Sequence, residues 1–244
     1  MSGHSKWAKI HRQKAVTDQQ RGKIFTKLGR AITVAVKEGG GVADPDMNFK
    51  LRLAIDKARQ ANMPGTNIQK AVASAAGPGA DSNWEYITYE GYGPVNTAVL
   101  VEVVTDNRNR ALSEIKQIFD KSGGRLGQAG SVNYLFDRVG QILIETAKTT
   151  DDQILQIMEI PGVTDLEQQP EGLEITTEPT QLKSVQEKIT TGFKLPVSEA
   201  EIIMKPKISR QVNDDESTKV QQFIDKLEDS DEVQNVWSDV EIVN

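Results

Sequence analysis

The feature that most constrains the fold is a change in the spacing of apolar residues at GPGADS, residues 77–82. Before this segment, apolar residues recur every three or four positions, which is the spacing of one helix face. After it, short β-rich runs alternate with helical runs. Glycine and proline at this density are typical of a linker. The sequence therefore predicts a helical part up to residue 77, followed by a part of mixed α and β structure.

The helical part is expected to contain three packed helices. The first, at residues 17–38, begins at a capping box in which Gln20 stands three residues after Thr17, and it ends at three glycines. A second helix is expected at 46–62 and ends before a Pro-Gly pair. A third, at 66–77, begins at another Thr-x-x-Gln pair, Thr66 with Gln69, and ends at a glycine.

After residue 82, the residue pattern predicts short strands separated by helices. Strands are expected at residues 86–92, 97–104, 132–136, 140–145, 172–178, 197–204 and 233–243. Helices are expected at residues 110–122, 150–160, 180–191 and 215–229, with Thr150 and Gln153 capping the second of them. Strands interleaved with helices in this way are typical of α+β, ferredoxin-like units. The pattern does not say which strands pair.

Charge is divided unevenly along the chain. Residues 1–77 hold 14 Lys and Arg against 5 Asp and Glu, a balance of +9, whereas residues 78–244 hold 15 against 30, a balance of −15; together these give the net charge of −6. This asymmetry favours a polyanion-binding arm on an acidic body. The alternative is a helical domain whose solvated face happens to be basic.

Other function classes find little support in the composition. Cysteine is absent, which excludes disulfides, thiolate catalysis and Cys-ligated metal. The two histidines, His4 and His11, have no neighbouring acid, so they predict neither a metal site nor a catalytic base. The chain lacks a secretory signal and a long apolar run. We therefore expect a cytoplasmic, non-enzymatic protein without cofactor, metal, membrane or small-molecule partner.

The first candidate binding element is the N-terminal arm, because a row of cations can neutralise successive phosphates. Its aromatic residue can stack on an unpaired base, or else pack on the helices as a staple. The histidines can donate hydrogen bonds or stack. The candidate residues of the arm and of the helix that follows it are His4, Lys6, Trp7, Lys9, His11, Arg12, Lys14, Arg21, Lys23, Lys27 and Arg30.

A second group of candidates lies in the turns of the body. Arg108 and Arg110 stand at a predicted helix N-terminus, which suits phosphate binding, although a helix cap with Arg110 paired to a neighbouring acid explains them equally well. Arg125 lies in a G-x-x-G segment, the pattern with which KH domains clamp a nucleic-acid backbone, although a tight turn explains its glycines more simply. Among the nearby aromatic residues, Tyr92 is expected to be the most exposed.

Several long motifs resemble one family. They are GHSKWAKI at 3–10, RGKIFTKL at 21–28, GGGVADPDMNFKLRLAIDKARQANMP at 39–64, YEGYGP at 89–94, TDNRNR at 105–110 and GGRLGQAGSVNYLF at 123–136. Together they are similar to the YebC/PmpR family over about residues 3–140. The resemblance is weaker beyond, where DEVQNVWSD at 231–239 is similar to the C-terminal strand. The sequence departs from the family at Val95-Asn96, where two glycines are usual, and at Ala31 and Ala111.

The resemblance implies a three-helix domain followed by two α+β domains, one inserted in the other. We expect these domains at residues 1–77, at 78–129 with 206–244, and at 130–205. Members of the family are generally designated cytoplasmic DNA-binding transcriptional regulators, and some have been assigned to the ribosome, where they help translation through sequences such as proline runs.

Three hypotheses follow for the function. The first is a DNA-binding transcriptional regulator, which the customary family designation favours. The second is a ribosome-associated translation factor that binds ribosomal RNA and tRNA. A stacking tryptophan in a basic arm suits irregular RNA at least as well as duplex DNA, and no clear recognition helix is present to read base edges. The third is an interaction protein whose acidic body recruits a partner. The sequence predicts a nucleic-acid-binding regulator and leaves the template open.

Overall fold

The computed structural model of the protein describes residues 18–77, 84–145 and 149–241, with side chains from residue 21 onward. The described residues form two compact units. One unit contains the chain up to Leu135 and again from Arg210, and the other is Phe136–Ser209. We refer to them as the larger unit and the inserted unit.

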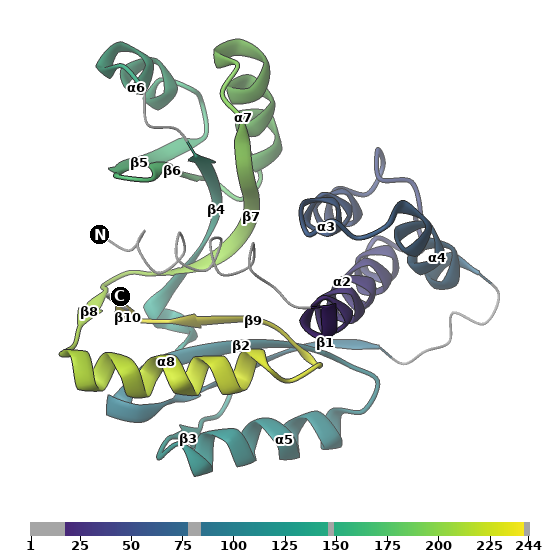
Figure 1. Cartoon of the computed structure of the whole chain (residues 1–244), viewed down its shortest axis with the longest axis vertical. Coiled ribbons are helices and arrows are strands. Elements are labelled where there is room, and N and C mark those ends of the chain that lie inside the picture. The colour runs from purple at the N-terminus through teal and green to yellow at the C-terminus, as the bar shows by residue number, and fades with distance from the viewer. Residues whose placement is uncertain (1–17, 78–83, 146–148, 242–244) are drawn as a thin grey trace. The chain divides into compact units, whose positions relative to one another are not determined.

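The larger unit begins with three helices, α2 (Asp18–Glu38), α3 (Phe49–Gln60) and α4 (Gly65–Ala76), which are drawn in purple and blue in Figure 1. The helix face predicted from the apolar spacing is the one that is buried. Its core side chains are those of Leu28, Ile32, Ala35, Val36, Leu51, Ile55, Ala58, Met63, Ile68 and Ala75. Burial of this shared face gives short helices a stability that none would have alone.

Two helix starts differ from the prediction. Helix α3 begins at Phe49 rather than at Asp46, because Asn48 is its N-cap and accepts a hydrogen bond from the Leu51 N–H at 3.1 Å. Helix α4 is not capped by Thr66: Pro64 occupies the N-cap without a side-chain hydrogen bond, so the threonine falls inside the first turn. The predicted cap at Thr17 lies outside the described residues.

The larger unit continues into a four-stranded sheet with strand order β3-β1-β2-β9. Its strands are β1 (Glu85–Tyr92), β2 (Ala98–Thr105), β3 (Arg125–Leu126) and β9 (Val233–Ser238), all paired antiparallel. A 3₁₀ turn, η1 (Pro94–Asn96), joins β1 to β2. A small parallel pair, β8 (Arg210–Gln211) with β10 (Val240–Glu241), follows the inserted unit and closes the chain's described end.

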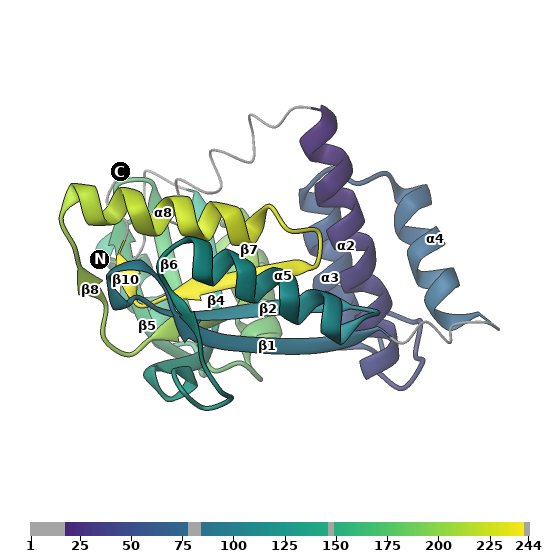
Figure 2. The same cartoon turned by 90° about the horizontal axis from the view of Figure 1, so that it is seen from below.

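Two helices, α5 (Arg108–Lys121) and α8 (Asp214–Glu228), cover one face of this sheet (Figure 2). They meet at an edge-to-face contact between Phe119 and Phe223, whose ring centroids are 4.9 Å apart. The face of β2 beneath them carries valines at alternate positions, namely Val99, Val101 and Val103. This alternation is what the strand period of two requires of a sheet with one helix-covered face.

The inserted unit is a second antiparallel sheet with strand order β5-β6-β4-β7. Its strands are β4 (Phe136–Glu145), β5 (Val163–Gln169), β6 (Gly172–Thr177) and β7 (Val197–Pro206). Its helices are α6 (Asp151–Met158) and α7 (Leu182–Lys188), and α7 continues into the π-helical turn η3 (Ile189–Phe193). The capping box predicted at Thr150 is confirmed.

Both sheets share one arrangement. In the inserted unit β6 lies between β4 and β5, the two strands that α6 connects; in the larger unit β1 lies between β2 and β3, the two strands that α5 connects. A strand lying between two strands joined by a helix is the ferredoxin-like arrangement. The α+β, ferredoxin-like prediction is confirmed.

One strand prediction was wrong, and one strand of the inserted unit was not predicted. Residues 132–136 alternate in polarity, but they form a 3₁₀ turn, η2 (Asn133–Leu135), and the strand starts only at Phe136. The backbone N–H groups of Val132 and Asn133 are bound by the Glu90 carboxylate, which replaces a strand ladder. Strand β5 was not predicted, because an edge strand of sequence VTDLEQQ lacks the apolar run that marks a buried one.

Within the described part of the chain, no helix is long and apolar enough to span a bilayer. The same residues contain no group of three or more His, Asp or Glu side chains placed to hold a metal ion.

Candidate nucleic-acid interface

The predicted arm precedes the described part of the chain. The residues concerned are His4, Lys6, Trp7, Lys9, His11, Arg12 and Lys14, all of which lie outside the described residues. The remaining candidates lie at three places in the larger unit: on α2, at the start of α5, and on β3.

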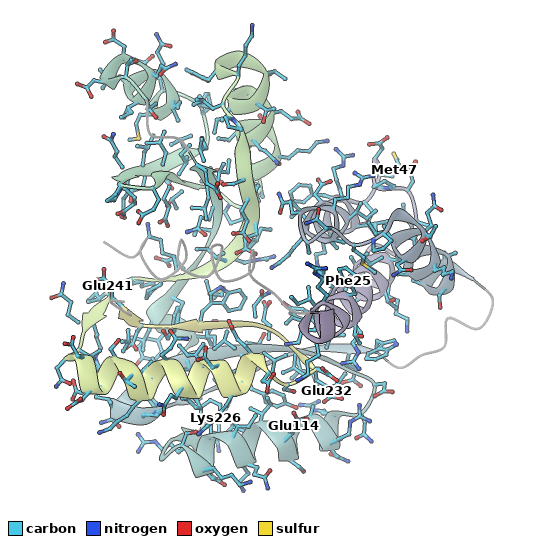
Figure 3. The ribbon with its side chains drawn as sticks, in the orientation of Figure 1. Phe25, Met47, Glu114, Lys226, Glu232 and Glu241 are labelled. Carbon is cyan, nitrogen blue, oxygen red and sulfur yellow. The ribbon has the colours of Figure 1, made fainter. Side chains whose placement is uncertain are left out.

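The cations of α2 turn toward the C-terminal end of α8. The Lys23 ammonium is 3.0 Å from a carboxylate oxygen of Asp229. Lys27 donates a hydrogen bond to the backbone carbonyl of Glu228, and Arg30 donates one to that of Asp231. Figure 3 labels Glu232, in the loop after α8, next to α2. Lys23, Lys27 and Arg30 are therefore engaged within the protein, and the fourth candidate on α2, Arg21, has an exposed side chain that also interacts within the protein.

This contact is electrostatically favourable for two reasons. The last carbonyl groups of α8 have no intrahelical partner and form the negative end of its dipole, so cations are stabilised beside them. The hydrogen bond from Lys23 to Asp229, with the charge of that carboxylate, also raises the pKa of the lysine. Arg30 makes a second contact as well: its guanidinium lies over the Trp84 ring, 5.2 Å from the ring centroid.

At the start of α5 the two arginines differ. Asn107 caps the helix by accepting a hydrogen bond from the Arg110 N–H at 3.1 Å. The Arg110 guanidinium is ion-paired with Asp106, at 2.6 Å, and with the buried carboxylate of Glu232. The hydrogen bond that Arg110 donates to Glu232, followed by the one that it donates to Asp106, raises the pKa of Arg110. This geometry supports the alternative of a capped helix with a paired arginine, whereas Arg108 is exposed.

On β3, exposed Arg125 stacks on an aromatic ring. Its guanidinium is 5.1 Å from the ring centroid of Tyr92, which is half-buried rather than freely exposed. The two glycines of the G-x-x-G segment have packing roles. A Cβ atom on Gly124 would lie 2.6 Å from the Tyr92 carbonyl, and one on Gly127 would lie 2.4 Å from the Ser131 hydroxyl oxygen. These glycines allow the backbone to lie against β1.

Two buried acids that organise these turns were not predicted. Glu232 accepts hydrogen bonds from Arg110 and from the Thr105 hydroxyl, the latter at 3.1 Å. Glu90 accepts three backbone hydrogen bonds from residues 130–133. The available signal for Glu90 was an acid inside a strand pattern, between an aromatic residue and a glycine. Glu232 gave no such signal, because it lies in the acidic segment DSDE at 229–232.

Two family models together match nearly the whole chain. The model described as the TACO1/YebC protein N-terminal domain matches residues 5–78, which include the predicted arm and the three helices. The model described as the TACO1/YebC second and third domain matches residues 84–240.

Relatives and a solved structure agree with this assignment. A protein of Thermoanaerobacter pseudethanolicus is 47% identical over 99% of this chain and 98% of its own length. A protein of Enterococcus faecalis is 43% identical over 99% of both chains; each is named a "Probable transcriptional regulatory protein". The crystal structure of a conserved hypothetical protein from Aquifex aeolicus matches with a TM-score of 0.83 and 38% identity, over 94% of each chain. The chain therefore belongs to the TACO1/YebC family.

Proposed function

We propose that the protein is a non-enzymatic regulator of gene expression that binds nucleic acid through its N-terminal arm. The observation that carries this proposal is the charge division, +9 in residues 1–77 against −15 in residues 78–244. A polyanion is attracted to the first part and repelled by the second, so the division selects where nucleic acid binds. The names of the relatives support regulation as the purpose of that binding.

The contacts divide into two groups. Lys6, Lys9, Arg12 and Lys14 bind successive phosphates, while Trp7 stacks on a base and the two histidines add polar contacts. Exposed Arg108 and Arg125 contribute further cations. Lys23, Lys27, Arg30 and Arg110 support the interface indirectly, because they bind groups of the larger unit. On this proposal α2 is held against α8 while the arm that precedes it engages nucleic acid.

The names of the relatives favour transcription as the level of regulation, and hence DNA as the nucleic acid that is bound. A second candidate is a translation factor that binds ribosomal RNA or tRNA on the ribosome. It is favoured by the stacking of the exposed Arg125 guanidinium on the half-buried Tyr92 ring, because unpaired RNA bases are commonly bound by stacking on aromatic and guanidinium groups.

The salt dependence of binding tests the role of the arm. Changing Lys6, Lys9, Arg12 and Lys14 to Ala removes four cations. We therefore expect the negative slope of log K against log salt to become shallower by about 3 for duplex DNA or single-stranded RNA. The charge-matched control changes four exposed lysines elsewhere, Lys116, Lys121, Lys188 and Lys219. Equal slopes in the arm variant and the wild type would remove the arm from the interface.

The template is tested in cell lysate. Co-sedimentation with ribosomes that survives DNase and is lost after RNase supports the translation factor. A reproducible promoter footprint with the purified full-length protein supports the transcriptional regulator.

A further inference from the structure

The segment after β3 is held rigidly on the surface of the larger unit. The carboxylate of Glu90, a β1 residue only 8% exposed, accepts hydrogen bonds from the N–H groups of Gly130 at 2.7 Å, and of Val132 and Asn133 at 2.9 Å. Burial works against the charge and raises the pKa of Glu90, but these backbone hydrogen bonds outweigh it and lower the pKa overall. The ionised acid therefore fixes the backbone of residues 130–133.

Close backbone packing adds to this restraint. The Gly127 N–H donates a hydrogen bond to the Glu90 carbonyl at 2.7 Å, and the Tyr92 hydroxyl donates one to the Ser131 carbonyl at 3.3 Å. The side chains that follow the restrained segment are therefore presented on a fixed surface and lose little further entropy when a ligand binds.

The side chains on this surface are aromatic, cationic and amide. Tyr134 is 62% exposed and lies beside Tyr92, whose pKa is raised by burial and by this second phenol. The Arg125 guanidinium lies over the Tyr92 ring on the exposed edge strand β3. Gln128 and Asn133 are also exposed. We name Tyr92, Arg125 and Tyr134 the Tyr134 patch.

An exposed aromatic face beside a guanidinium suits one chemical class well. A nucleobase stacks on the ring, the guanidinium attracts the adjoining phosphate or extends the stack, and amide side chains can bond base edges. In duplex nucleic acid the base faces are already stacked on each other, so the patch suits an unpaired nucleotide.

We propose that the Tyr134 patch is a second nucleic-acid contact, which stacks an unpaired base of a single strand on Tyr134 and binds its phosphate with Arg125. This proposal rests on the proposed function, and it adds to the arm a site in the larger unit that selects single-stranded over duplex segments.

The test uses the full-length protein and a 12-nucleotide single strand that contains 2-aminopurine, whose fluorescence is quenched by stacking. Tyr134→Leu keeps an apolar side chain but removes the ring. We expect it to weaken binding about 5- to 100-fold and to abolish the part of the quenching that depends on this ring. Tyr134→Phe keeps the ring and should bind within about threefold of the wild type.

Matched controls separate stacking from other effects. Tyr86→Leu removes a tyrosine of β1 that is 42% exposed, and it should leave binding unchanged. Arg125→Gln should lower the salt slope for single strands by about 0.7, the value for one phosphate contact. The circular dichroism spectrum and urea midpoint of each variant establish that it is folded.

The outcomes distinguish this proposal from the proposed function. If Tyr134→Leu and Arg125→Gln bind the single strand as the wild type does, while the arm variant does not, the patch proposal is overturned and the arm remains the contact. That result would leave the patch as a protein-binding or loop-stabilising surface. If the wild type binds neither duplex nor single strand, both proposals fall. Weaker binding in Tyr134→Leu with recovery in Tyr134→Phe supports the patch.

Discussion

Glu90 is a single acid that joins distant parts of the larger unit. Its carboxylate is buried, a position that disfavours charge, yet it is surrounded by backbone N–H donors that only an anion satisfies fully. Hydrogen bonds to a charged group contribute about 1.5–3 kcal/mol each, more than neutral ones. The ionisation of this residue therefore controls the conformation of residues 130–133.

Glu90→Gln tests this role, because the amide keeps the size of the side chain but turns an N–H₂ group toward N–H donors. We expect the free energy of unfolding at pH 7 to fall by about 2–3 kcal/mol. The folded-state pKa of Glu90 is lowered, so its contribution is complete above the unfolded value, about 4.3, and is lost as the pH falls through the folded value. The difference between variant and wild type should therefore shrink in acid.

Urea unfolding at pH 7, 5 and 3.5 measures this difference. Glu85→Gln, at an exposed position of the same strand, is the control and should change the unfolding free energy by less than about 0.5 kcal/mol. A constant difference between Glu90→Gln and the wild type at all three pH values would contradict the role assigned to the carboxylate.

At the scale of elements, the turn between β1 and β2 holds two non-glycine residues in the left-handed region. Val95 and Asn96 both have positive φ, 59° and 54°. Asparagine tolerates this left-handed region, but a β-branched residue is strained in it. Val95 is partly buried and packs against Val220 and Val240. Packing therefore offsets backbone strain in this turn.

A pair of substitutions separates these two contributions. Val95→Ala loses the packing and keeps a Cβ atom in the left-handed region, whereas Val95→Gly loses the packing and the strain together. Because the left-handed conformation costs a non-glycine residue about 1–2 kcal/mol, we expect the Gly variant to be more stable than the Ala variant by about 1 kcal/mol in urea unfolding. An Ala variant equal to or more stable than the Gly variant would show that the turn is not strained.

At the scale of the whole molecule, charged side chains connect helices that are far apart in the sequence. The segment at 228–232 binds the α2 cations through the Asp229 carboxylate and through the backbone carbonyls of Glu228 and Asp231. An exposed ion pair such as that of Lys23 with Asp229 contributes little by itself, and the hydrogen bonds from Lys27 and Arg30 to backbone carbonyls add to it at the same helix end.

A triple variant tests this contact. Changing Lys23, Lys27 and Arg30 to Gln should increase amide hydrogen exchange at residues 228–233 about tenfold at low salt, because the segment loses its three partners on α2. The effect should diminish in 0.5 M salt, which screens the wild-type contact as well.

A charge-matched triple variant provides the control. Lys50, Arg52 and Arg59 form ion pairs with Glu38, Asp46 and Asp56 inside the three-helix part, so changing them to Gln should leave exchange at residues 228–233 unchanged. The same increase in both variants would attribute the effect to net charge rather than to the contact with α8.

The sequence by itself determined the properties that depend on neighbouring residues. Apolar spacing predicted the helices and most of the strands, the Thr150 capping box is confirmed, and the charge division is read directly from the residues. These features arise within a few residues along the chain, where helix and strand periods are expressed.

Only the tertiary structure decided which distant groups meet. Lys23 and Asp229 are 206 positions apart, and Glu90 and Gly130 are 40 apart. No local pattern predicts that cations on one helix bind the end of another. Nor does one predict that the Glu90 carboxylate, rather than a neighbouring strand, accepts the hydrogen bonds of the backbone N–H groups at residues 132–133. The strand order has the same origin, because pairing depends on how the chain returns to the sheet rather than on the period within a strand.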